Sequence, residues 1–96
     1  MVVGVLKIDI YMDGNRSLKA KRQVLKSLIQ RVKSKFNNVS VAEVDSNDLW
    51  KKATIGVCFV SNETPFVNST LDQVLGFIES TGTVHILASE IEIIHF

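Results

Sequence analysis

The side chains with the clearest potential for chemistry are cations gathered in one segment of the chain. Between Gly14 and Phe36 there are eight basic residues and no acidic one. These eight are Arg16, Lys19, Lys21, Arg22, Lys26, Arg31, Lys33 and Lys35. Only Lys7, Lys51 and Lys52 stand against the ten carboxylates of the remaining chain. The net charge of +1 therefore conceals a basic segment in an otherwise acidic chain, and this layout favours an anionic partner.

The basic segment coincides with the start of an expected helix. Backbone N–H groups at a helix N-terminus are unpaired and positive, so acidic residues are normally found there, and an anion binds there readily. Because the cations continue along the helix, their pattern suits a nucleic-acid backbone better than a single small anion. A solvated face that only keeps the chain soluble is the other interpretation. The residues that we predict to bind RNA or another anion are Arg16, Ser17, Lys19, Arg22, Lys26 and Lys33.

Hydrophobic periodicity predicts six elements that position these side chains. Apolar residues alternate in four segments, as in strands, and repeat with a helical period in two others. Ser17 suits the N-cap of the first helix, and Gly82 suits the end of the second. The expected elements are strands over Val2–Met12, Val39–Val44, Ala53–Val60 and Val84–His95, with helices over Leu18–Phe36 and Pro65–Ser80.

The βαββαβ order of these elements predicts an α+β fold. Its two halves have similar lengths, as in the split βαβ arrangement of the ferredoxin-like fold. In that topology two helices cover one face of a four-stranded antiparallel sheet and leave the other face open. The 96 residues are sufficient for one such domain, spanning 1–96.

The first helix has an apolar side that we expect to face the core. At about 100° per residue, a row of lysines lies along one flank of this apolar side, namely Lys19, Lys26 and Lys33. Arg22 lies closer to the border between the two. The apolar side consists of Leu18, Leu25, Ile29, Val32 and Phe36, with Leu28 at its edge.

The open face of the expected sheet offers little for base stacking. RNA-binding domains that use such a face stack bases on aromatic residues, and here only Tyr11 is suited to that role. RNA is therefore expected to contact the basic helix through phosphates, with weak sequence preference. The alternative is a homodimeric protein-interaction domain that binds through this flat, partly apolar face. Its small and apolar residues are Val3, Val5, Thr54, Gly56, Cys58 and Val60.

Trp50 is the one tryptophan and is followed by Lys51 and Lys52. A ring beside two cations is suited to a stacking tip that contacts a base. A single tryptophan also commonly packs over the rim of a core. Both interpretations of Trp50 remain open.

Other chemistries find little support in the sequence. Cys58 has no partner for a disulfide, and His85 and His95 lack the spacing of zinc ligands. Asp9, Asp13 and Glu43 have no spacing that by itself establishes a carboxylate pair. No phosphate-binding loop, dinucleotide fingerprint or nucleophile motif is present, so we predict no catalytic residue, cofactor or metal.

A small phosphate-ester or acyl-phosphate enzyme is a weak alternative. An acylphosphatase shares the expected fold and also places an arginine after the first strand, where this chain has Arg16. The glycine-rich aromatic context of such an arginine is missing. The longest apolar run is shorter than the roughly 18 residues of a membrane span, and no leader pattern is seen, so a cytoplasmic location without membrane contact is expected.

Three stretches of the sequence resemble the YlxP-like family of small bacterial proteins. They are SLKAKRQVLKSL at 17–28, VSVAEVDSNDLWKKATIGVCFVSN at 39–62 and EIEII at 90–94. The resemblance implies a ferredoxin-like fold and assigns no catalytic residue. It also implies a link to ribosomes, because genes of this family often lie beside those of translation initiation and ribosome-maturation factors. Together with the basic helix, it favours a non-enzymatic module that binds ribosomal RNA or a ribosomal subunit.

Overall fold

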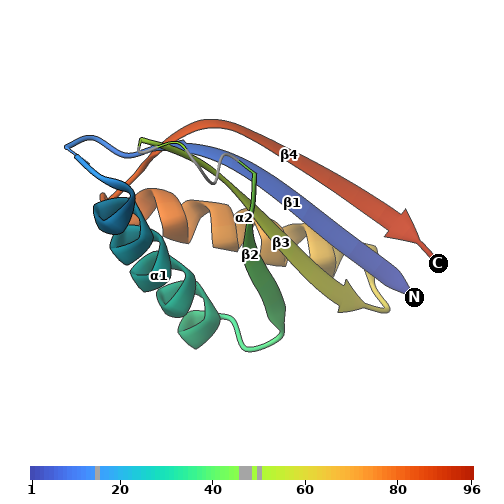
Figure 1. The fold of residues 1–96 in the computed structure, drawn as a ribbon. Coiled ribbons are helices and arrows are strands. Elements are labelled where there is room, and N and C mark those ends of the chain that lie inside the picture. The colour runs from blue at the N-terminus through green and yellow to red at the C-terminus, as the bar shows by residue number, and fades with distance from the viewer. Residues whose placement is uncertain (15, 46–48, 50) are drawn as a thin grey trace.

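The computed structural model describes residues 1–14, 16–45, 49 and 51–96 of the chain. Four strands form one sheet in the order β2-β3-β1-β4, and all neighbouring strands are antiparallel (Figure 1). The elements are β1 (Val2–Tyr11), α1 (Leu18–Lys35), β2 (Val39–Asp45), β3 (Lys52–Ser61), α2 (Thr64–Ser80) and β4 (His85–His95). The predicted ferredoxin-like βαββαβ fold is confirmed, and the ends of the elements differ from the expected ones by a few residues at most.

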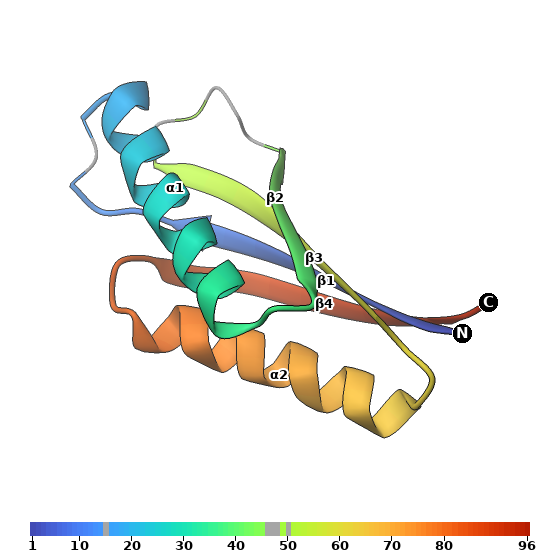
Figure 2. The same ribbon diagram turned by 90° about the horizontal axis from the view of Figure 1, so that it is seen from below.

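Both helices cover the same face of the sheet (Figure 2). On this face the alternating residues of the two central strands are buried, among them Leu6 and Ile8 of β1 and Ile55 of β3. α1 packs against β2, whereas α2 packs against β1, β3 and β4. The opposite face of the sheet carries Lys7 and is left open by both helices. The fold therefore presents two separate surfaces, an open sheet face and a helical face.

The buried side of α1 differs from the predicted one. Leu25, Leu28 and Val32 are buried together with Lys21, whereas the predicted core residues Leu18, Ile29 and Phe36 are only half-buried. The helix is thus rotated towards Lys21 and Leu28. A cation breaks the apolar pattern at position 21, so the pattern alone favoured a rotation that left this side chain outside.

Two glycines adopt the left-handed backbone conformation, which costs glycine little because it lacks a Cβ atom. Gly14 has a φ of 77° in the turn before α1, and Gly82 has a φ of 70° just after α2. Gly82 lies where the sequence predicted the end of the second helix. None of the helices in the described part of the chain has the length and apolarity needed to span a membrane.

Gly4 lies on the core face of β1, where a Cβ atom would overlap side chains of Val67 and Leu71. We expect Gly4→Ala to lower the free energy of unfolding by about 1–3 kcal/mol, because a filled core must shift to admit another group. Gly76→Ala is the matched control, since a Cβ there meets nothing within 4 Å. Alanine is about 1 kcal/mol better than glycine inside a helix, so this control should gain stability. Urea unfolding measures both, and an undiminished stability of Gly4→Ala would contradict the packing.

Candidate nucleic-acid interface

Ser17 is the N-cap of α1, as predicted. Its hydroxyl oxygen accepts a hydrogen bond from the backbone N–H of Ala20 at 3.1 Å. The first turn of the helix contains no acidic residue, so no side chain there compensates the positive end of the helix dipole. Arg16, just before the cap, is exposed. The N-terminus of α1 is therefore closed by its own serine and surrounded by positive charge.

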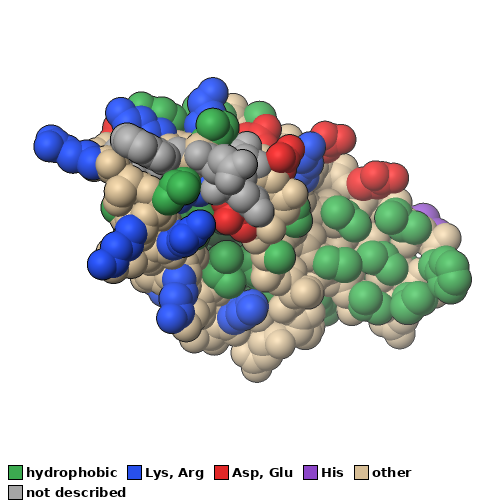
Figure 3. Space-filling view, in the orientation of Figure 1, with side chains coloured by type: hydrophobic (Ala, Val, Ile, Leu, Met, Phe, Trp, Pro, Cys, Tyr) green, Lys and Arg blue, Asp and Glu red, His purple; other side chains and the backbone are tan. Residues whose placement is uncertain are grey.

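A basic row runs along the exposed side of α1 and consists of Lys19, Arg22, Lys26 and Lys33. All four side chains are exposed, and Lys and Arg side chains gather over α1 in Figure 3. The three lysines repeat every seven residues, so they return to nearly the same side of the helix over about 20 Å. Within residues 1–14, 16–45, 49 and 51–96, neither Arg16 nor any member of the row forms an ion pair with a carboxylate. Five of the predicted residues are thus exposed, and four of them lie on one side of α1.

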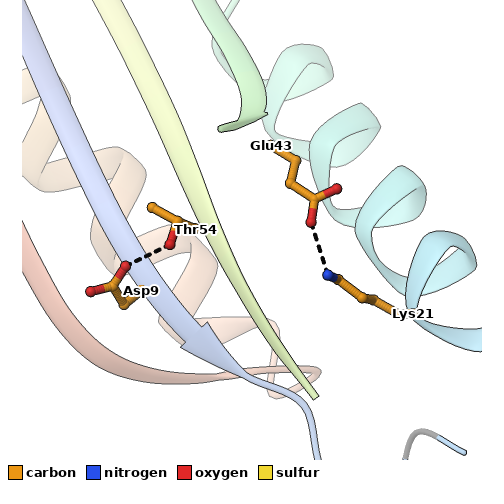
Figure 4. Close-up of polar contacts among 4 residues, drawn as sticks. All are labelled: Asp9, Lys21, Glu43 and Thr54. Atoms are coloured by element: carbon orange, nitrogen blue, oxygen red, sulfur yellow. Dashed lines mark hydrogen bonds and ion pairs between the residues drawn. The ribbon is translucent and has the colours of Figure 1, made fainter. Parts of the chain in front are cut away.

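Lys21 is not part of this surface, although the sequence grouped it with the cations of the first turn. Its side chain is 1% exposed, and its Nζ atom lies 3.0 Å from Oε2 of Glu43 (Figure 4). Strand β2 places Glu43 on the side of the sheet that faces α1, which supplies the counter-charge for a buried ammonium group. Lys21 therefore joins α1 to β2 and is unavailable to a partner.

Arg31 and Lys35 lie on the other side of α1, beside α2. The guanidinium carbon of Arg31 is 5.8 Å from the ring centroid of Phe77, and Nζ of Lys35 is 5.5 Å from it. Both distances are in the range of cation–π contacts. These two cations therefore pack on an aromatic ring of α2 and lie apart from the basic row.

The three carboxylates considered from the sequence do not meet. Asp9 accepts a hydrogen bond from Thr54 on the open face, while Glu43 contacts Lys21 on the helical face (Figure 4). Asp13 lies in the turn after β1, with its Oδ2 atom 3.2 Å from Nε2 of His85. No carboxylate pair for acid–base catalysis is formed by these three residues.

One residue of the predicted site, the possible stacking tip Trp50, is not among those that the structure describes. Its neighbours Lys51 and Lys52 are described and exposed. What sequence reasoning missed is the Asp9–Thr54 pair, which had one visible signal. Aspartate is depleted in strands, and here it stands inside a long alternating one.

Comparisons with known proteins agree with the fold and the sequence resemblance. The family described as "Protein of unknown function (DUF503)" matches residues 3–91. The uncharacterized protein YlxP of Bacillus subtilis (strain 168) is 35% identical over 79 residues, which cover 82% of this chain and 85% of the relative. A de novo designed protein with a ferredoxin fold, LFR1 1, aligns with a TM-score of 0.54 at 12% identity, covering 98% of this chain and 84% of its own. The protein YJCS aligns with a TM-score of 0.56 at 5% identity, over 97% of this chain and 99% of its own.

Proposed function

The chain belongs to the DUF503 family of proteins of unknown function, and for this member we propose that the basic row binds the phosphate backbone of RNA. The predicted resemblance to YlxP-like proteins is confirmed by the same matches. One observation carries the proposal. Arg16, Lys19, Arg22, Lys26 and Lys33 are all exposed, and none has a carboxylate partner among the described residues.

The distribution of the other cations supports this assignment. Three other cations of α1 contact groups within the chain. Lys21 forms an ion pair with Glu43, and Arg31 and Lys35 pack on the ring of Phe77. Among the described residues, the cations on the outer side of α1 form neither an ion pair nor a cation–π contact. Unneutralised cations in a row attract a polyanion over a longer range than single contacts do. They also gain free energy from the counterions that the polyanion releases.

The geometry of the row favours backbone contacts over base recognition. Lysine and arginine heads reach phosphates from an exposed helix side without opening the RNA, and such contacts carry no sequence information. Along the row the lysines are about 10 Å apart, which lets each contact a different phosphate. We therefore expect weak sequence preference. Ribosomal RNA, alone or in a ribosomal subunit, is the partner that we propose.

Binding of fluorescent RNA, followed by anisotropy, tests this proposal. We expect a hairpin from ribosomal RNA and an unrelated hairpin of equal length to bind with affinities within about tenfold of each other. The complex should weaken steeply as salt is added. Cosedimentation of the purified chain with ribosomal subunits then asks whether the same surface is used on the particle. Failure to bind either RNA at low salt would contradict the proposal.

We also propose that two copies associate through one end of the open sheet face. Hydrophobic side chains gather at the end of the sheet where both termini lie (Figure 3). Val60 and Ile94 both pair with Val3 across the strands and are 52% and 40% exposed, and Phe96 beyond them is 88% exposed. Contiguous apolar surface of this kind commonly marks an association site, and a two-fold dimer is the simplest way to cover it.

Val60→Glu is expected to shift the chain from dimer to monomer, because a carboxylate at the two-fold contact would be buried against its own copy. Sedimentation equilibrium over a range of protein concentrations measures the shift. Leu87→Glu is the matched control, since Leu87 is 56% exposed but lies on β4 towards the other end of the same strand pairing. A native chain that is monomeric at the highest concentration would overturn the dimer.

A further inference from the structure

The open sheet face contains a hollow that no sequence motif predicted. It has a volume of about 330 Å³, at the lower end of the range for small-molecule sites. Its position is away from α1, so it is distinct from the basic row. The side chains that matter for its chemistry are Lys7, Asp9, Asp45, Lys52, Thr54 and Leu87.

Two irregularities of the sheet occur at the level of this hollow. In β4 the register with β1 shifts between Asp9 and Ile10, so that Leu87 has no direct partner. In β2 the register with β3 shifts between Glu43 and Asp45. Each edge strand thus carries one bulge, and the two bulges flank the Asp9–Thr54 pair of the central strands. Bulges often occur beside functional sites, where they change the direction of a side chain.

Each bulge brings one extra residue to the open face. Glu43 faces the helices, so regular alternation would give the next residue to the open face and return Asp45 to the helical side. The shift instead pairs Asp45 with Thr54 and places it at the hollow. In the same way the shift in β4 places Leu87 at the hollow, where it is 56% exposed.

The hollow is lined by the carboxylate of Asp9, which accepts a hydrogen bond from Thr54. Thr54 is only 5% exposed, and its hydroxyl donates to Oδ1 of Asp9 at 2.8 Å (Figure 4). The two residues face each other across the two central strands β1 and β3. Asp9 is half-buried there, so its carboxylate is partly shielded from water while Thr54 holds Oδ1. The ammonium group of a ligand would donate hydrogen bonds to this carboxylate in place of the water that burial excludes.

Charges of both signs line the hollow. Lys7 and Lys52 are exposed at its rim, and neither forms an ion pair with Asp9 in the described part of the chain. A ligand with a single charge would meet attraction from one sign and repulsion from the other. A ligand with both charges satisfies both sets of groups.

We propose that this hollow binds a small zwitterion, an α-amino acid. Its ammonium group contacts Asp9, its carboxylate contacts Lys7 or Lys52, and its side chain lies against Leu87. This site goes beyond the proposed RNA binding, since it lies on a different face and recognises a different chemistry.

The experiment is a titration of the isotope-labelled chain with each standard L-amino acid in turn, followed by two-dimensional amide NMR. At least one amino acid should give saturable shifts at Asp9, Thr54 and Leu87 and none along α1. That amino acid is then compared with its carboxamide, which lacks the negative charge, and with its deaminated acid, which lacks the positive charge. Both analogues are expected to bind at least about tenfold more weakly.

Asp9→Asn tests the role of the carboxylate, because the amide oxygen can still accept from Thr54 while the charge is lost. The substitution should weaken binding of the amino acid by at least about tenfold. The dispersion of the amide spectrum should otherwise match that of the native chain. Glu92→Gln is the control, since it removes a carboxylate of β4 that does not line the hollow. The proposal is overturned if no amino acid gives saturable shifts there, if the analogues bind equally well, or if Asp9→Asn binds like Glu92→Gln.

Discussion

Glu43→Leu is expected to lower the free energy of unfolding by about 3–5 kcal/mol, a large part of the stability of a small domain. The reason is the environment of Lys21, whose side chain is 1% exposed and lies 3.0 Å from the Glu43 carboxylate. Removing that carboxylate leaves a buried ammonium group without this counter-charge. Desolvation of a charge costs several kcal/mol, and here the attraction that offsets it would be lost.

A double-mutant cycle separates the ion pair from the packing of its side chains. Lys21→Met should cost less than Glu43→Leu, because Glu43 is 23% exposed and water can solvate the carboxylate left behind. The double variant replaces the pair by apolar groups of similar size and should recover most of the loss. Urea unfolding of the four proteins gives the coupling energy. Additive losses in the double variant would show that the pair contributes no coupling and would contradict the account of α1 docking.

Lys19→Glu combined with Lys26→Glu is expected to weaken RNA binding by at least about 100-fold. Each substitution removes a charge-assisted contact to a phosphate, for which about 1.5–3 kcal/mol is typical, and adds a repulsive carboxylate. Both side chains are exposed on one side of α1, so the fold itself should be little affected. Fluorescence anisotropy with a ribosomal RNA hairpin measures the change.

The matched control is Arg31→Glu combined with Lys35→Glu. It changes the net charge by the same amount on the same helix, but on the side that packs against Phe77. If binding depends only on total charge, both double variants lose affinity equally. Equal losses would therefore contradict a site on the basic row, whereas a much smaller loss in the control supports it. Circular dichroism of both variants checks that α1 remains folded.

The sequence was sufficient to predict the fold because its local signals agree with one another. Alternation along β1 separates Leu6 and Ile8 from Lys7, and the structure buries the first two and exposes the third. The cap at Ser17 and the glycine after α2 set the helix ends correctly. Patterns of period two and 3.6 depend only on which side faces the core, so they survive without knowledge of the partner elements.

The rotation of α1 was not predictable in the same way. Lys21 looks like a surface residue in any pattern of hydrophobicity, and its burial depends on a carboxylate that arrives from β2. The open-face hollow escaped for a related reason. A bulge shifts the register by one residue and moves a side chain to the other face, and nothing in the sequence around Asp45 or Leu87 marks that shift.

The salt dependence of RNA binding by the native chain tests the central claim most directly. If four or all five of these cations (Arg16 and the basic row) contact phosphates, the logarithm of the binding constant should fall with the logarithm of salt concentration with a slope between about −3 and −4.5. The slope should be shallower by about one unit or more in the variant with Lys19→Glu and Lys26→Glu. A slope near zero, or the same slope in this variant, would contradict binding of RNA along α1.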